Sequence, residues 1–217
     1  MDRRELRRAW DELAEPYAAS RRADGDDAAL IDGLLESVPS EATVLDVGCG
    51  DGRRTLANLA GVDRIGLDLS RRQLELAADA VPDGQLLQGE LTALPLAANA
   101  VDAITAYHTV FHVPRAEHPA VYAEFARVLR PGGRLLMTGS SGRYETVRND
   151  WLGSGRAMFF STPGPRRTRE ALERAGFELD WERTVDDPLG SSVPFVMATY
   201  RGERLEFEKA SGGYRSY

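Results

Sequence analysis

Apolar residues along this chain occur in short continuous runs that alternate with stretches of helical period. Five runs have the length and composition of strands: 44–47, 65–68, 85–90, 100–113 and 134–138. The fourth run is apolar enough to be buried on both faces of a sheet. Three intervening stretches have the pattern of helices: 53–60, 70–81 and 121–129. Because strand and helix alternate in this way, the sequence predicts a parallel sheet with helices on both faces.

The two ends of the chain depart from this alternation. Leu6, Trp10, Leu13 and Tyr17 are spaced as on one face of an amphipathic helix, which we expect to break near Pro16. A second helix with an apolar face ends before Pro39. The further expected elements are a helix over 167–175, extended runs over 177–185 and 192–201 that pair as antiparallel strands, and an additional strand over 202–210.

These elements predict an α/β fold with a single Rossmann-like, doubly wound sheet. The sheet is expected to be mostly parallel, with an antiparallel C-terminal edge strand and helices on both faces. A chain of 217 residues fits one domain, large enough to bury a core without disulfides or metal ions. We therefore expect a single domain over residues 1–217.

Composition narrows the classes of function. A net charge of -7 argues against a non-specific nucleic-acid binder, because contacts with phosphates supply most of such affinity. Cys49 is the only cysteine, so an intramolecular disulfide and a cysteine-rich metal site are excluded. No apolar run approaches the roughly 20 residues of a membrane span, and the first ten residues lack a signal-peptide core. We expect a cytoplasmic protein with no membrane partner.

Candidate chemistry starts with the glycine turn that follows the first strand. Gly48 and Gly50 let a ligand lie against bare backbone, and Asp46 adds a carboxylate just before them. A pyrophosphate is disfavoured beside that carboxylate, whereas S-adenosylmethionine (SAM) brings an ammonium and a sulfonium. Asp68 ends the second strand, twenty residues after Gly48, where an acid can accept hydrogen bonds from two ribose hydroxyls.

Four segments then resemble the class I SAM-dependent methyltransferases, closest to the small-molecule group typified by ubiquinone-biosynthesis-like enzymes. They are LDVGCGDG (45–52), the acid of IGLDLS (65–70), GELTALPLAANAVDAI (89–104) and EFARVLRPGGRLLMT (124–138). The resemblance covers residues 42–138 in motif detail and extends to residue 200 in element order. It implies a SAM-binding core over 41–138, between an N-terminal helical cap (1–40), a substrate lid (139–165) and a C-terminal part (166–217).

The resemblance also implies which residues bind the methionine and ribose parts of the cofactor. Asp46, Gly48 and Gly50, with Cys49 between the two glycines, would receive the methionine end of SAM. Asp68 would bind the ribose hydroxyls.

Further residues are implied for the adenine and for the ammonium group. Leu69 would pack on the adenine ring, and Leu91 would contribute a backbone N–H to it. Glu90 would accept from the adenine amino group, in a position where the family usually has aspartate. Ala106 and Tyr107 would offer a carbonyl to the ammonium.

A general base is needed only if the acceptor carries a proton to be removed. His112 matches the second histidine of a pair that the family often has after the fourth strand, while Phe111 replaces the first. His108 and Tyr107 are the other candidates, although His108 shares a face with His112 only if this stretch is helical. A purely structural role remains open for each of the three.

The acceptor pocket is expected along 139–165, which mixes aromatic residues with arginines. The aromatic residues could exclude water or pack a cationic substrate, whereas Arg143, Arg148 and Arg156 could hold an acidic one. Tyr17, with the arginines that follow it, could cover the mouth of the ligand site. A lid that packs on the core without touching substrate is the alternative.

The favoured function is SAM-dependent methyl transfer to a small molecule by in-line displacement, with S-adenosylhomocysteine (SAH) as the cofactor product. The fourth strand ends in AYHT without the tetrapeptide of DNA amino-methylases, and no acidic cluster suggests a metal. An NAD(P)-dependent oxidoreductase shares the turn and the distant acid, but the glycine spacing disfavours it, and the only lysine, Lys209, gives no Tyr-x-x-x-Lys pair. A non-catalytic SAM-binding partner or sensor remains open, as does the oligomeric state.

Overall fold

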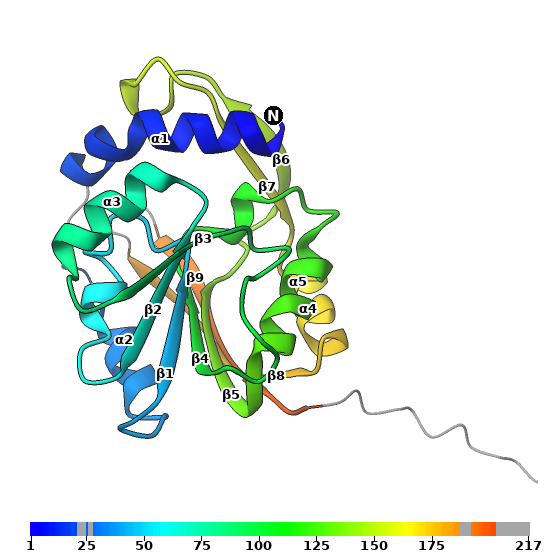
Figure 1. Ribbon diagram of the computed structural model, residues 1–217. Coiled ribbons are helices and arrows are strands. Elements are labelled where there is room, and N and C mark those ends of the chain that lie inside the picture. The colour runs from blue at the N-terminus through cyan, green and yellow to red at the C-terminus, as the bar shows by residue number, and fades with distance from the viewer. Residues whose placement is uncertain (21–24, 26–27, 187–191, 203–217) are drawn as a thin grey trace, which may run out of the picture.

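The structure, a computed structural model, describes residues 1–20, 25, 28–186 and 192–202 (Figure 1). Within these residues a seven-stranded sheet has the order β3-β2-β1-β4-β5-β9-β8. Its strands are β1 (Thr43–Val47), β2 (Asp63–Asp68), β3 (Gln85–Gln88), β4 (Val101–Ala106), β5 (Leu129–Thr138), β8 (Phe177–Asp186) and β9 (Ser192–Tyr200). The first five are parallel, and β9 pairs antiparallel with β5 and with β8. The predicted fold class is confirmed, including its antiparallel C-terminal edge.

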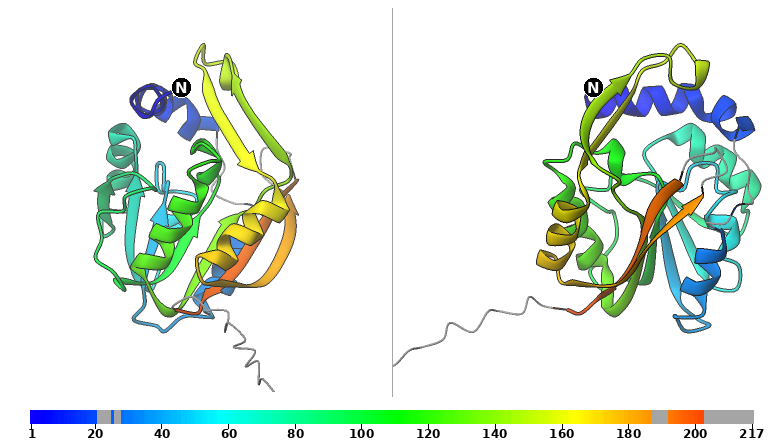
Figure 2. Two further views of the ribbon diagram at one scale, coloured as in Figure 1. Left: turned by 90° about the vertical axis from the view of Figure 1, so that its right-hand side faces the viewer. Right: turned by 180° about the vertical axis from the view of Figure 1, so that it is seen from behind.

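Helices cover both faces of the sheet (Figure 2). An apolar cluster lies on each face of the sheet, and successive residues of β1 contribute to one and the other. Leu45 packs in one cluster with Phe125, and Val44 packs in the other with Ile31. The first cluster lies under α4 (His118–Val128) and α5 (Pro165–Arg174), and the second lies under α2 (Ala28–Leu35), beside the end of α3 (Arg71–Ala80). This alternation is expected of a strand that is buried on both sides.

The chain reverses its direction of travel across the sheet between β1 and β4, and such a switch point opens a crevice at the carboxyl ends of the strands. α1 (Arg3–Ser20) and a hairpin of β6 (Arg143–Arg148) and β7 (Met158–Pro163) lie over this end (Figures 1 and 2). Leu13 of α1 packs against Met158 and Phe160 of β7. The segment 139–165, expected to form a lid, thus contains the β6–β7 hairpin, which packs on α1.

The expected break near Pro16 is wrong, because α1 continues to Ser20. Pro16 lies on the exposed face of the helix, so water can solvate the carbonyl oxygen that loses its N–H partner there. One more helical turn is thereby tolerated.

Two elements near the switch point are shorter than predicted. The expected helix over 53–60 is only a 3₁₀ turn (Leu56–Asn58), because the Asp46 carboxylate accepts hydrogen bonds from the Thr55 hydroxyl and the Leu56 backbone. The expected strand over 100–113 ends at Ala106, because His108 adopts a left-handed conformation with φ of 52°. A second 3₁₀ turn (Val110–His112) follows.

Other local predictions hold. Ser70 caps α3 by accepting from the Gln73 N–H at 3.1 Å, as the capping pattern predicts. The strand expected over 202–210 lies almost wholly outside the described residues. In the described part of the chain, no helix has the length and apolar character of a membrane span.

Two glycine substitutions are expected to change stability in opposite directions. A Cβ at Gly66 would lie 2.8 Å from Leu56, 2.9 Å from Leu86 and 3.0 Å from Cys49, so Gly66→Ala should lower the free energy of unfolding by about 1–3 kcal/mol. A Cβ at Gly33, inside α2, meets no atom within 4 Å, so Gly33→Ala should raise it by about 0.5–1 kcal/mol. Urea denaturation measures both, and equal midpoints would contradict this packing.

Candidate functional site

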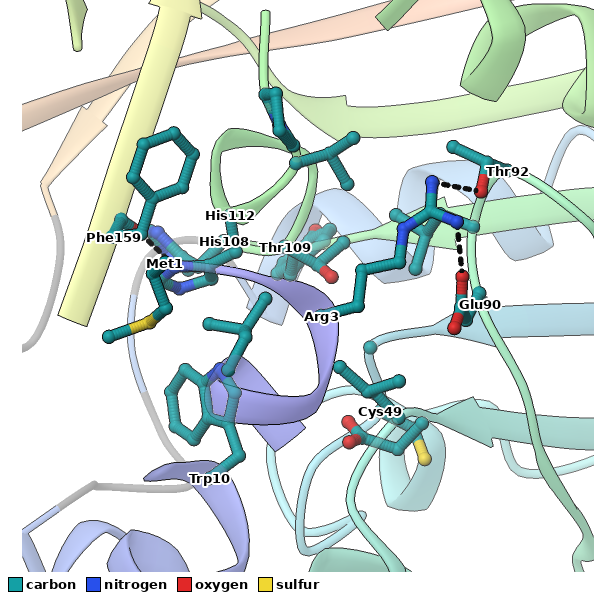
Figure 3. Close-up of a pocket in the computed structure, with 18 of the residues that line it drawn as sticks. Met1, Arg3, Trp10, Cys49, Glu90, Thr92, His108, Thr109, His112 and Phe159 are labelled. Carbon is teal, nitrogen blue, oxygen red and sulfur yellow. Dashed lines mark hydrogen bonds and ion pairs between the residues drawn. The ribbon is translucent and has the colours of Figure 1, made fainter. Parts of the chain in front are cut away.

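A cavity of about 360 Å³ opens at the carboxyl ends of β1, β2 and β4 (Figure 3). Its floor comes from the glycine turn after β1 and from the ends of β2, β3 and β4, and α1 and β7 close it from above. Most residues predicted from the sequence line it: Tyr17, Gly48, Cys49, Asp68, Leu69, Glu90, Leu91, Tyr107, His108 and His112. The volume is within the range of small-molecule sites.

Asp68, at the end of β2, is a buried carboxylate that faces this cavity. Its Oδ2 accepts from the Gly50 N–H at 3.0 Å, and its Oδ1 accepts from the Ser70 N–H at 2.8 Å. Burial raises the pKa of Asp68 to about 6, although these backbone hydrogen bonds oppose the shift. Asp68 therefore joins the glycine turn to the start of α3 and still presents acceptor lone pairs to a ligand.

The glycine turn brings backbone rather than side chain to the cavity. Gly48 has φ of 68°, and a Cβ there would lie 2.2 Å from the Thr109 hydroxyl oxygen. The N–H groups of Gly48 and Cys49 both donate to the Leu67 carbonyl, at 2.7 and 3.1 Å. Burial raises the pKa of the Cys49 thiol well above its usual value, so the thiol stays protonated and is not a nucleophile.

Asp46 does not line the cavity, contrary to the expectation that it receives a ligand directly. It is fully buried beneath the turn, where Thr55 donates to one carboxylate oxygen and Thr105 of β4 donates to the other at 2.7 Å. Burial raises the pKa of Asp46 to about 7. Its contact with the cavity is indirect, through Thr55, which is a lining residue.

Gly50 and Ala106 also lie outside the cavity lining. Gly50 uses its N–H for Asp68, and the Ala106 side chain is buried in the core at the end of β4. Sequence spacing locates such residues near the right strand ends, but it does not tell which of them reach the cavity surface.

Glu90 is held by a residue that sequence reasoning missed. Arg3, in the first turn of α1, forms an ion pair with Glu90 at 2.8 Å and donates to the Thr92 hydroxyl at 2.9 Å (Figure 3). Arg3 also pairs with Glu117. The guanidinium thus bridges the ends of β3 and α4 across the cavity. The capping pair Asp2 and Glu5, whose reciprocal hydrogen bonds are both 2.8 Å, was the sequence signal that a helix begins here.

His112 lines the opposite side of the cavity and is buried. Its Nδ1 lies 2.8 Å from the carbonyl oxygen of Phe159 in β7. A carbonyl can only accept, so Nδ1 carries the proton and the neutral ring keeps its lone pair on Nε2. Burial lowers the pKa of His112 to about 4, so the side chain is uncharged at neutral pH.

Aromatic rings from three distant segments gather around His112. Trp10 packs edge to face against His112, Tyr17 and Trp151, with centroid distances of 5.2, 5.1 and 5.4 Å. His108, whose ring lies 6.2 Å from that of Phe111, is held by its backbone N–H, which donates to the Thr138 hydroxyl at 2.9 Å. His108 and His112 both line the cavity, but the first precedes the 3₁₀ turn that contains the second.

The other lining residues missed by sequence reasoning come from the roof and from loops. They are Met1, Asp2, Leu6, Trp10, Asp51, Arg54, Thr55, Thr92, Thr109, Val113, Pro114 and Glu117, in addition to Arg3. Phe159, from the aromatic segment expected at the acceptor pocket, also lines the cavity. Arg143, Arg148 and Arg156, expected as holders of an acidic substrate, are not among the lining residues. Across the described segments, no group of three or more His, Cys, Asp or Glu side chains is placed to hold a metal ion.

Comparison with known proteins identifies similar chains. Residues 45–137 match the model of a family described as a methyltransferase domain. The chain is 41% identical over 102 residues to the methyltransferase GfsG of Streptomyces halstedii, a match that covers 43% of this chain and 36% of that protein. It is 34% identical over 128 residues to a demethylmenaquinone methyltransferase of Renibacterium salmoninarum, covering 57% and 53%. The chain thus spans about a third to a half of the length of these relatives.

Solved structures share the fold. One is the 1,6-didemethyltoxoflavin-N1-methyltransferase of Burkholderia thailandensis, crystallised with 1,6-didemethyltoxoflavin and S-adenosylhomocysteine. It aligns with a TM-score of 0.69 at 19% identity, covering 92% of this chain and 88% of that one. This likeness confirms the fold, and the family match over residues 45–137 agrees with the resemblance to methyltransferases found in the sequence.

The raised pKa of Asp46 predicts a pH-dependent stability. Between about pH 4 and 7 the folded protein keeps a proton on Asp46, whereas the unfolded chain, with an ordinary pKa of about 3.9, has released it. The free energy of unfolding should therefore fall as the pH rises through this window, by at most about 1.4 kcal/mol per pH unit. Urea denaturation at pH 5, 6, 7 and 8 measures the slope.

Asp46→Asn is the matched control, because its amide can hydrogen-bond to both threonine hydroxyls without titrating. Subtracting its profile from that of the wild type removes the contributions of Asp68 and His112, which titrate in both proteins. Parallel profiles of the two proteins would contradict the assignment.

Proposed function

We propose that this chain is a class I SAM-dependent methyltransferase that transfers the methyl group of SAM to a small-molecule acceptor, as the match of residues 45–137 to a methyltransferase-domain family supports. The observation that carries this proposal is the buried carboxylate of Asp68, which faces the cavity beside a glycine turn. A carboxylate offers about four lone-pair sites, and the backbone N–H groups of Gly50, Leu69 and Ser70 donate to this one. The acceptor capacity that remains is assigned to the ribose hydroxyls.

The remaining lining residues fit the other parts of SAM. Leu69 and Leu91 supply apolar surface for the adenine ring, and Glu90 supplies an acceptor for its amino group. Gly48 brings backbone without a side chain to the methionine end, with Cys49 beside it, and the Arg54 side chain in the same turn adds a positive charge there.

Asp46 has an indirect role in this proposal. It holds Thr55 and thereby fixes the shape of the turn from below, instead of meeting the cofactor itself. Ala106 and Tyr107 were both expected to meet the ammonium group of SAM. Only Tyr107, which follows β4, lines the cavity, so this role is proposed for Tyr107.

When bound, SAM supplies a methyl group activated by a positively charged sulfur. The chain has to hold an acceptor in line with it, and correct alignment alone contributes on the order of 7 to 11 kcal/mol. His112 can accept a proton from the acceptor, because its tautomer leaves Nε2 unprotonated. His108 and Tyr107 lie in the same lining and are the secondary candidates.

The roof over this cavity, α1 and the β6–β7 hairpin, would act as the lid that excludes water. Phe159 supports this role, since it lines the cavity and its carbonyl fixes the tautomer of His112. A lid of this kind strengthens every electrostatic contact below it by lowering the local dielectric constant.

Calorimetry with SAM, SAH and NADH distinguishes this function from its alternatives. We expect micromolar binding of SAM and SAH and none of NADH, whereas binding of NADH alone would favour an oxidoreductase. SAM binding with no turnover of any acceptor would favour a sensor.

Asp68→Asn tests the residue that carries the proposal. The amide retains one acceptor oxygen but loses the charge, so SAH affinity should fall at least tenfold. Asp83→Asn, an exposed aspartate paired with Arg64 outside the cavity, is the control and should leave SAH affinity unchanged. Thermal denaturation verifies that both variants are folded, and an unchanged affinity of Asp68→Asn would refute the ribose assignment.

Arg3→Ala tests the link between α1 and the adenine end. Loss of the guanidinium leaves Glu90 without its partner, so SAH affinity should fall by about 1.5-fold to fivefold, the range expected for an exposed ion pair. Arg4→Ala, one position along the same helix and outside the cavity lining, serves as the control. Equal affinities in titration calorimetry would show that Arg3 does not position Glu90.

A further inference from the structure

The charged side chains and the rings of the cavity are unevenly distributed (Figure 3). Its charged residues belong to the glycine turn, to the ends of β2 and β3, to the first residues of the chain and to the residue before α4. Trp10, His112 and Phe159 line the side opposite Glu90 and Thr92. If SAM occupies the charged side, as the proposed function requires, the ring-lined side is left for the acceptor.

Among the described residues that line the ring side of the cavity, none is an arginine or lysine that could hold an anion. Of the two arginines that line the cavity, Arg3 is bound to Glu90 and Glu117, and Arg54 lies in the glycine turn. Arg156 of the hairpin is turned away to pair with Glu12 at 2.9 Å. His112 is neutral. A carboxylate or phosphate buried there would lack a counter-charge, which is strongly unfavourable.

A cationic acceptor is disfavoured for a different reason. The sulfonium would already place one positive charge in this cavity, and a second would repel it at low dielectric constant. Trp10 meets His112, Tyr17 and Trp151 edge to face at interplanar angles of 82°, 78° and 78°, so these rings pack on one another instead of forming a box of ring faces. Such edge contacts suit another flat, uncharged ring.

The weak basicity of His112 limits the kind of hydroxyl group that the acceptor can carry. Its unprotonated Nε2 is a weak base, because the surrounding rings exclude water from the imidazole. A weak base removes a proton readily only from an acidic hydroxyl. Phenols have a pKa of about 10, whereas water, to which aliphatic hydroxyls are similar, has about 15.7.

We infer that the acceptor is an uncharged aromatic compound with a phenolic hydroxyl, whose ring lies against Trp10 and Phe159 and whose hydroxyl donates to Nε2 of His112. This rests on the proposed function, whose site it extends. In the reaction the O–H bond breaks and its proton passes to Nε2, while an oxygen lone pair forms the new O–CH₃ bond. The S–CH₃ bond breaks with its electrons left on sulfur, and the imidazolium then returns its proton to water.

Three matched naphthalenes test this inference with the wild-type protein saturated with SAH. The probes are 2-naphthol, 2-naphthalenemethanol and 2-naphthoate, and tryptophan fluorescence measures their binding. We expect 2-naphthol to bind at least tenfold more tightly than 2-naphthoate. With SAM in place of SAH, mass spectrometry should detect methylated 2-naphthol, and methylation of 2-naphthalenemethanol should be at least a hundredfold slower.

Variants separate the base from the ring contacts. His112→Asn keeps a donor for the Phe159 carbonyl but lacks Nε2, so methylation of 2-naphthol should fall by about 10²–10⁴-fold while SAH affinity is unchanged. Trp10→Ala should weaken binding of 2-naphthol at least fivefold. Tyr144→Ala, an exposed aromatic residue outside the cavity, should have no effect.

The outcomes distinguish the two levels of the proposal. Normal SAH binding with tighter binding or faster methylation of 2-naphthoate would overturn the acceptor class and leave the methyltransferase function standing. Methylation of 2-naphthol that survives in His112→Asn would overturn the role of His112. Failure to bind SAH would refute the proposed function itself. The ranking of the three probes uses only the wild type, so it does not depend on the folding of any variant.

Discussion

The carboxylate of Asp68 is the contact on which the rest of the cavity depends. It accepts one backbone N–H from the glycine turn and one from the residue that caps α3, at 3.0 and 2.8 Å. Because both N–H groups are satisfied by one side chain, the turn and the helix start are held at a fixed separation. The Ser70 hydroxyl then donates to Asp11 of α1 at 2.7 Å, so the same junction also anchors the roof.

The roof contributes as much to the cavity as the sheet does. α1 supplies a carboxylate to the start of α3, a guanidinium to the ends of β3 and α4, and an indole to the ring cluster around His112. Its apolar face packs on β7, whose Phe159 carbonyl selects the tautomer of His112. The tautomer and the surroundings of His112 are therefore set by α1 and β7, two segments that lie far from it in the sequence.

The sequence predicted the sheet and its edge well, because their signals are local: apolar runs, glycine turns, and acids at strand ends. The positions of Asp68 and Glu90 follow from the same local signals, because side chains at the carboxyl ends of parallel strands lie at one edge of the sheet. The errors arise where a tertiary contact overrides a local pattern. Asp46 captures Thr55 and Leu56 and so shortens a helix, and the left-handed His108 ends a strand early. The contact of Arg3 with Glu90 carries no local signal, because it exists only once α1 is docked. The aromatic composition of 139–165 pointed to Phe159 as part of the pocket, but not to the contact of its carbonyl with His112.

Two of the polar attachments of α1 differ in strength. Toward its C-terminal half, Asp11 receives two hydrogen bonds in partly buried surroundings. At its N-terminus, Arg3 and its partners Glu90 and Glu117 are between 38% and 49% exposed, and such ion pairs are weak and screened by salt. The N-terminal end of α1, beside Glu90, is therefore held less firmly than the part beside α3. Added salt weakens these exposed ion pairs and leaves the partly buried hydrogen bonds of Asp11 almost unchanged, so ionic strength acts first on the N-terminal end of α1.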